Sequence, residues 1–237
     1  MQPEISRAYY AKLNGTPQIY LIQVNQPLNL YINILVPAIA GQKKDVSVMV
    51  LKDSKQLAIL DGSNFKWKRF FEPFGFDTYW KGPEYKVLVE AGQYEVRVSS
   101  GKNDSRYALA IGEKEVFTFK EGLRDLSVVP QLKRSFFKES PISFILSPFG
   151  FGEVVIIYLL DLIVILILRA IFKKLRYGIQ KNIGPKDRRI CLIAGWLLLL
   201  LSISTVWSVI LIFLSGLLLL TAYFRWCGLY SLIKKHH

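Results

Sequence analysis

The sequence holds very few residues of the kinds that bind metals or carry redox chemistry. Its only histidines are His236 and His237 at the C-terminus, and its only cysteines, Cys191 and Cys227, lie at the edges of apolar segments. Zinc, haem and iron–sulfur sites need several such ligands at defined spacings, and a Ser-His-Asp triad needs a histidine inside the fold. We therefore expect no metal, no cofactor and no catalytic residue, and we predict that the protein is not an enzyme.

Acidic residues are scarce in the C-terminal third. Residues 151–237 contain three acidic and 11 basic side chains, whereas residues 1–150 contain 15 and 20. Asp187 is the only acid in a stretch with eight basic residues, namely Arg169, Lys173, Lys174, Arg176, Lys181, Lys186, Arg188 and Arg189. A basic cluster between two apolar segments is typical of a cytoplasmic loop in a membrane protein. The net charge of +13 therefore does not indicate nucleic-acid binding.

Two long apolar segments predict three membrane spans. Val154–Phe172 is long enough to cross the ~30 Å hydrocarbon core once at ~1.5 Å per residue. Ile190–Phe224 has no charge over 35 residues, about 52 Å as one helix, which is too long for a single crossing. The polar stretch Ser202–Ser208 suggests a turn between two helices. We predict a first transmembrane helix over 153–173 and a transmembrane hairpin over 190–230.

The basic residues also predict an orientation in the lipid bilayer. If the loop 174–189 is cytoplasmic, the tail 231–237 is cytoplasmic and the part before Val154 lies outside the cytoplasm. Met1–Thr16 lacks the apolar region of a signal peptide. We therefore expect a leader upstream of Met1; a first span acting as a reverse anchor and an inverted orientation are the alternatives.

The C-terminal segment carries a motif at each end. It opens with Asn182-Ile183-Gly184 followed by Asp187-Arg188, and it closes with Trp226-Cys227-Gly228-Leu229-Tyr230. This pattern resembles the YgaP-like inner-membrane domain, a two-helix hairpin that opens with N-[IV]-G-x-x-D-R and closes with C-P-x-Y. Gly228 stands where the family usually has proline. The resemblance implies a bacterial inner-membrane hairpin that packs against itself or a partner, and it implies no activity.

Asp161 is the residue that is most costly to place in a membrane. A carboxylate in the middle of a span costs ~2.5–3.5 kcal/mol unless it is protonated, paired or hydrated. Its depth in the first span matches that of Ser215, and Gly195 and Ser215-Gly216 are small enough for close helix approach. We predict that Asp161 makes a helix–helix or subunit contact. A small transporter that uses Asp161 is the alternative.

Cys227 and Cys191 are both expected near the cytoplasmic ends of the hairpin. Thiols in a reducing compartment are most often packing residues. The alternative hypothesis is a sulfur- or redox-handling protein in which Cys227, together with Cys191, reacts at the cytoplasmic face.

Residues 1–125 are predicted to form an extracytoplasmic β-sandwich of the jelly-roll or immunoglobulin-like kind. Leu28–Val36 alternates apolar and polar residues, as a strand with one buried face does. Similar short segments follow at Ile19–Val24, Asp45–Leu51, Gln56–Leu60, Phe65–Phe71, Tyr85–Val89, Gln93–Ser99, Tyr107–Ile111 and Glu115–Phe119. The stretch Glu90–Val98 with Tyr107–Gly112 weakly resembles bacterial prepeptidase-C-terminal-like jelly-roll domains, which are non-catalytic binding modules.

Aromatic residues are concentrated between Phe65 and Trp80. Because aromatic side chains anchor many interfaces, we predict partner-binding residues among them: Trp67, Phe71, Phe74, Phe76, Tyr79 and Trp80. A carbohydrate platform is a further option, and filling of the sandwich core is the simpler alternative. The phenylalanine-rich segment 126–152 is predicted to be a tether lying at the membrane surface, with Phe136 and Phe137 among its headgroup aromatics.

These features together favour a non-enzymatic, membrane-anchored β-sandwich protein. We expect its partners to be the lipid bilayer and either a second copy of the chain or a larger membrane complex, in which it is an accessory subunit.

Overall fold

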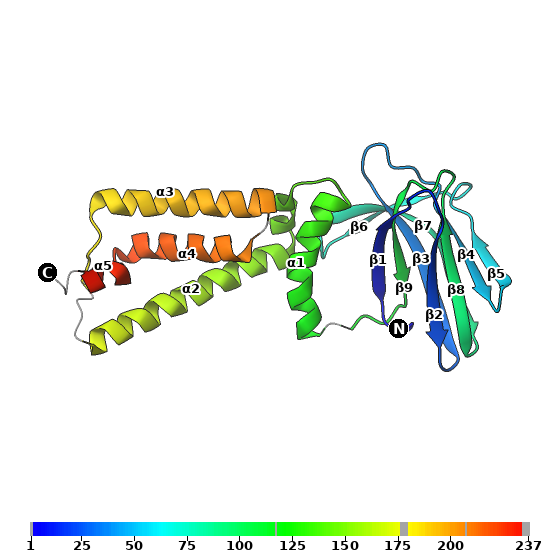
Figure 1. Cartoon of the computed structure of the whole chain (residues 1–237), viewed down its shortest axis with the longest axis horizontal. Coiled ribbons are helices and arrows are strands. Elements are labelled where there is room, and N and C mark those ends of the chain that lie inside the picture. Colours follow the sequence, from blue (N-terminus) through cyan, green and yellow to red (C-terminus); the bar gives the residue numbers. More distant parts are fainter. Residues whose placement is uncertain (1, 117, 176–179, 207, 234–237) are drawn as a thin grey trace. The chain divides into compact units, whose positions relative to one another are not determined.

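The computed structural model describes residues 2–116, 118–175, 180–206 and 208–233, so Trp207 and residues 234–237 of the predicted tail lie outside it. The chain divides into two compact units. The first contains Met1–Asp125 and Gln131–Lys138 and carries the strands; the second contains Leu126–Pro130 and Glu139–His237 and is helical (Figure 1).

The first unit is a sandwich of two antiparallel sheets. One sheet has the strand order β1-β9-β3-β7-β6 and the other β2-β8-β4-β5. Their bounds are β1 Arg7–Lys12, β2 Gln18–Val24, β3 Leu28–Pro37, β4 Ser47–Lys52, β5 Lys55–Leu60, β6 Lys68–Glu72, β7 Asp77–Val89, β8 Gly92–Ser99 and β9 Arg106–Ile111. The predicted two-sheet sandwich is thereby confirmed.

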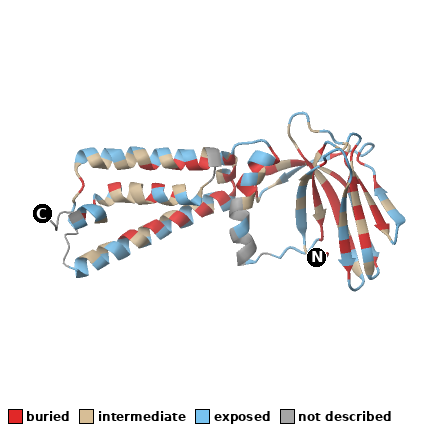
Figure 2. Ribbon diagram, in the orientation of Figure 1, coloured by how far each residue is buried: buried red, intermediate tan, exposed pale blue. Residues whose placement is uncertain are grey.

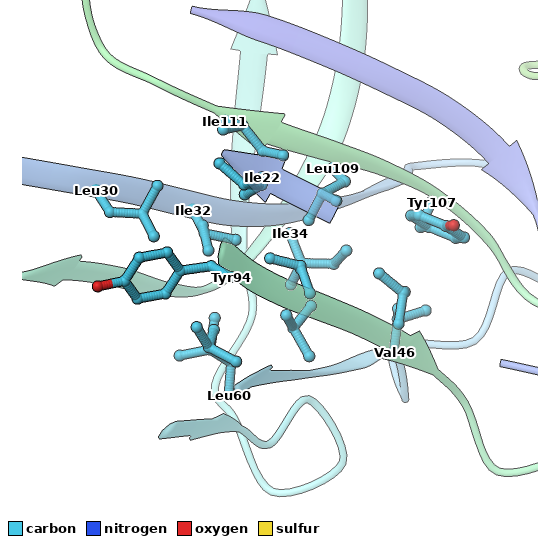
Figure 3. Close-up of a cluster of buried hydrophobic side chains, with 14 of the residues drawn as sticks. Ile22, Leu30, Ile32, Ile34, Val46, Leu60, Tyr94, Tyr107, Leu109 and Ile111 are labelled. Carbon is cyan, nitrogen blue, oxygen red and sulfur yellow. The ribbon is translucent and has the colours of Figure 1, made fainter. Parts of the chain in front are cut away.

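The core lies between the two sheets and follows the period-2 alternation of the strands (Figure 2). On β3 the buried side chains are Leu30, Ile32, Ile34 and Val36, as the sequence pattern predicted. Figure 3 shows residues of both sheets meeting there, with Tyr94 of β8 beside the β3 side chains. Burial of this apolar area is the main force that holds the sheets together.

The strand predicted over Glu115–Phe119 was wrong. After β9 the chain turns at Gly112, which has a φ of +83°, and a Cβ there would collide with the backbone carbonyl of Ile5. The turn takes the chain out of the sheet, and helix α1, Phe119–Ser135, begins at Phe119. Strand β1, which was not predicted, pairs with β9 from Arg7 to Lys12. Its side chains are mostly exposed, so its sequence lacks a buried face to signal it.

The end of α1 belongs to the sandwich. Phe136 and Phe137 are buried in a cluster with Tyr79 and Ala108. Lys133 is fully buried and donates to Asp77 Oδ1 at 2.7 Å and to the Phe76 carbonyl at 3.1 Å. The prediction that Phe136 and Phe137 lie among lipid headgroups was therefore wrong. The Lys133–Asp77 ion pair and the packing of the two rings with Tyr79 hold this segment against β7.

The second unit consists of a short 3₁₀-helix η1, Pro141–Leu146, and the helices α2 Pro148–Lys174, α3 Pro185–Leu201, α4 Val209–Phe224 and α5 Gly228–Ile233. The break between α3 and α4 is a π-helical turn, η2, over Ser202–Val206, within the stretch expected from composition. Within the described ranges, one helix, α2, is both long and apolar enough to cross a bilayer, and α4 is a shorter apolar helix. Ser147 and Ser208 cap α2 and α4 by accepting from backbone N–H groups.

Candidate functional site

Asp161 lies on the buried stripe of α2. This stripe recurs every three or four residues, through Gly150, Glu153, Ile157, Asp161 and Ile165, as one face of an α-helix does. Asp161 has 0% of its surface exposed. Within the part of the chain that the structure describes, neither of its carboxyl oxygens has a hydrogen-bond partner. Its full burial means that it faces other helices of the same chain and not a neighbouring subunit.

The residue opposite Asp161 is Gly216 of α4. A Cβ at position 216 would collide with Asp161 Oδ2 and would lie 3.0 Å from Cδ1 of Tyr158. The absence of a side chain at Gly216 is therefore what lets the carboxyl group fit between the two helices.

A chain of hydrogen bonds runs beside this contact. The Ser215 hydroxyl donates to the Gly195 carbonyl at 2.8 Å, linking α4 to α3. The same hydroxyl lies 3.0 Å from the Tyr158 hydroxyl of α2. The structure thus brings together the four residues predicted to make intramembrane contacts: Asp161, Ser215, Gly216 and Gly195. Tyr158 was missed, although it precedes Asp161 by three residues and so shares its helix face.

The other end of the hairpin is held by Asn182. Its side-chain amide donates to the Cys227 carbonyl at 2.8 Å and to Ser231 Oγ at 2.9 Å, and its carbonyl accepts from the Cys227 N–H at 2.8 Å. Asn182 therefore clamps the chain where α4 has ended and α5 begins. Cys227 and Cys191 are both free and half-buried. Asn182 binds the backbone of Cys227 and not its thiol. The two motifs therefore serve here to hold the ends of the hairpin together.

The aromatic residues predicted to bind a partner divide into two groups. Trp67 is buried in the core, and its Nε1 donates to the Gly62 carbonyl at 2.8 Å. Tyr79 is buried, with its hydroxyl 3.0 Å from that of Tyr10. Their selection as docking residues was wrong, because these side chains fill the interior. Trp80 is half-buried, and the Lys44 ammonium lies 4.2 Å from its ring centroid.

Three phenylalanines of the β6–β7 hairpin remain on the surface. Phe70, Phe71 and Phe76 are 41%, 49% and 38% exposed, and the rings of Phe71 and Phe76 meet edge to face at 5.1 Å. Phe70 and Phe71 are consecutive residues of β6, so their side chains point to opposite faces of the hairpin. We call Phe71 and Phe76, whose rings are in contact, the aromatic hairpin surface. Phe74, in the turn between the strands, is half-buried. Phe70 was not among the predicted docking residues, although it lies in the same aromatic-rich run.

The turn of this hairpin is firmly held. The Glu72 carboxylate accepts from the backbone N–H groups of Phe74 and Gly75 at 2.6 and 2.7 Å. Phe76 adopts a φ of +59°, which a bulky residue rarely does. Next to it, the Lys133–Asp77 ion pair fixes the start of β7. The hydrogen bonds of Glu72 and the Lys133–Asp77 ion pair therefore fix the backbone on both sides of the aromatic hairpin surface.

Residues 179–237 match the family described as "Inner membrane protein YgaP-like, transmembrane domain". The C-terminal hairpin is similar to the YgaP-like transmembrane domain. This confirms the resemblance predicted from its two motifs, and it supports a membrane location for the protein. In the YgaP-like hairpin of this chain, the first residue of the opening motif, Asn182, holds the cysteine of the closing motif by its backbone.

Solved structures show weak similarity to the sandwich. The pre-peptidase C-terminal domain of a collagenase from Bacillus anthracis is 10% identical with a TM-score of 0.29, over 45% of this chain and 85% of that chain. The catalytic domain of a GH87 α-1,3-glucanase in complex with tetrasaccharides is 12% identical with a TM-score of 0.25, over 47% of this chain and 22% of that chain. The comparison with curated proteins found no match. Among the described residues, no group of three His, Cys, Asp or Glu side chains could hold a metal ion.

Proposed function

We propose that this protein is a non-enzymatic, membrane-anchored accessory subunit that docks to another protein through the aromatic hairpin surface. The observation that carries the proposal is the exposure of Phe71 and Phe76, whose rings meet beside a turn that Glu72 holds in place. Exposed aromatic rings on a pre-organised element bind with a small loss of conformational entropy. The partner is a second copy of the chain or a subunit of a larger membrane complex.

The helices serve in this proposal as the anchor. We infer three membrane spans, α2, α3 and α4, because the segment that contains α3 and α4 matches a transmembrane family and is free of charge from Ile190 to Phe224. At ~1.5 Å per residue α3 and α4 are each about 25 Å long, which is somewhat short of the ~30 Å hydrocarbon core. The basic residues between α2 and α3 favour a cytoplasmic loop there. The sandwich then lies outside the cytoplasm and the C-terminus inside.

Site-specific photo-crosslinking in bacterial membranes tests the docking role. A photo-reactive phenylalanine analogue is placed at Phe71 in the full chain, and the matched control carries it at Ile59 of β5, which is similarly exposed. We expect a discrete crosslinked product from position 71 only. A product of twice the chain mass identifies a second copy, and any other discrete mass identifies a different subunit by mass spectrometry. Absence of a product at position 71, or the same products at both positions, would overturn the proposal.

A further inference from the structure

In the described part of the chain, the two hydroxyl groups beside Asp161, those of Ser215 and Tyr158, use their protons in other hydrogen bonds. The Gly195 carbonyl can only accept, so the Ser215 hydroxyl must give its single proton to it. Ser215 can then only accept from the Tyr158 hydroxyl, which uses the proton of Tyr158. Neither hydroxyl therefore has a proton left for the Asp161 carboxyl group. Gly216, which lies against Oδ2, has no side chain to offer one.

Among the residues that the structure describes, no charged side chain pairs with Asp161. Helix α4 contains no charged residue, and α3 contains none after Arg189. On α2 the nearest charged residues are Glu153 and Arg169, each eight residues away, or about 12 Å along the axis. The Arg169 guanidinium lies 5.2 Å from the Phe224 ring centroid, at the other end of the helix contact. The titratable side chain beside Asp161 is Tyr158, whose proton is already assigned.

An ionised carboxylate in this position would have neither a hydrogen-bond donor nor a counter-charge among the described residues. Burying such a charge costs far more free energy than burying the neutral acid. The neutral acid is also the form that can stay packed against Gly216, because it does not draw water between the helices.

We propose that Asp161 is a proton-binding site of the helical unit, which retains its proton for as long as α2 packs against α4. Loss of the proton and separation of the two helices at this level then occur together. Helix packing in the membrane anchor is thereby coupled to protonation. This inference concerns the helical unit alone and does not depend on the proposed docking function.

Infrared spectroscopy of the full chain in lipid nanodiscs detects the proton directly. We expect the C=O stretch of a protonated carboxylic acid at neutral pH. Labelling the wild-type protein with aspartate that carries ¹³C in its side-chain carboxyl group should shift this band. Glutamate labelled in the same way should leave the band unchanged. The band should be lost in Asp161→Asn and kept in Glu153→Gln, the matched variant that removes the other acid of α2. Absence of an aspartate acid band at neutral pH would overturn the proposal, and the labelling experiment needs no variant to fold.

The coupling is tested by measuring the distance between α2 and α4 in the same nanodiscs. Spin labels replace the exposed residues Ile167 and Leu214 in a chain with Cys191→Ser and Cys227→Ser, and the pH is raised stepwise. The proposal is supported if the distance between the spin labels increases as the acid band is lost. It is also supported if the band and the distance both stay unchanged. Loss of the band at constant distance, or a longer distance while the band persists, would overturn it.

Discussion

Oδ2 of Asp161 on α2 occupies the space that a side chain at position 216 of α4 would need. The acid and the glycine are 55 positions apart in the sequence and form one complementary contact. The buried carboxyl group of Asp161 therefore packs closely against α4 only because residue 216 is a glycine.

Gly216→Ala should destabilise the helical unit by about 1–3 kcal/mol, because its methyl group would overlap the carboxyl group of Asp161. Unfolding of the full chain in mixed micelles, followed by circular dichroism, measures the change. Gly152→Ala is the matched control, since a Cβ there meets nothing within 4 Å. It should be neutral or slightly stabilising. If both alanine variants unfold alike, the close approach at Gly216 has no energetic importance.

Lys133→Met should lower the free energy of unfolding of the sandwich by about 3–5 kcal/mol, because it removes the cation of a buried ion pair while the Asp77 carboxylate stays buried. Denaturant unfolding monitored by tryptophan fluorescence gives the value. Lys86→Met breaks an exposed ion pair with Glu113 and should cost at most about 1 kcal/mol. Adding Asp77→Asn to Lys133→Met should recover part of the loss. A double variant that is less stable than Lys133→Met would argue against loss of the buried ion pair as the cause.

Stability should fall above pH 10 through Tyr79. Burial, and after it the neighbouring Tyr10, raises the pKa of Tyr79 above the ordinary value of 10.0. The unfolded chain therefore loses this proton near pH 10 while the folded chain keeps it, so the stabilisation is complete below pH 10 and declines as the pH rises. Tyr79→Phe should be less stable at neutral pH by about 0.5–1.5 kcal/mol through loss of its hydrogen bond to Tyr10. The difference in the free energy of unfolding between Tyr79→Phe and the wild type should shrink above pH 10. Parallel curves of stability against pH would contradict the raised pKa of Tyr79.

The inferred orientation predicts which thiols a membrane-impermeant maleimide reaches in intact spheroplasts. In a chain with Cys191→Ser and Cys227→Ser, a cysteine at Ser54, in the exposed turn between β4 and β5, should be labelled. A cysteine at Lys174, the last residue of α2, should be labelled only after the membrane is permeabilised. The opposite pattern would show that the basic loop lies outside the cytoplasm.

Much of the sandwich could be predicted because its signal is local. The alternation along Leu28–Pro37 needs only the strand period to show which side chains are buried. Strand β1 could not be predicted in this way, because it forms by pairing with β9 and buries little of its own surface. The aromatic-rich run was predicted to bind a partner, yet its composition alone could not separate the buried Trp67 and Tyr79 from the exposed Phe70 and Phe71.

The sequence by itself determined the membrane location of the C-terminal third, the position of the break between α3 and α4, and the presence of a two-sheet sandwich, because hydropathy, charge and period-2 alternation act over a few neighbouring residues. Only the tertiary structure decided that Lys133 pairs with Asp77, that Phe136 and Phe137 pack on the sandwich, and that Asp161 lies against Gly216 with no hydrogen-bond donor among the described residues. Each of these contacts joins residues more than 25 positions apart, so it depends on how whole elements pack and on the cost of burying a polar group that is not compensated.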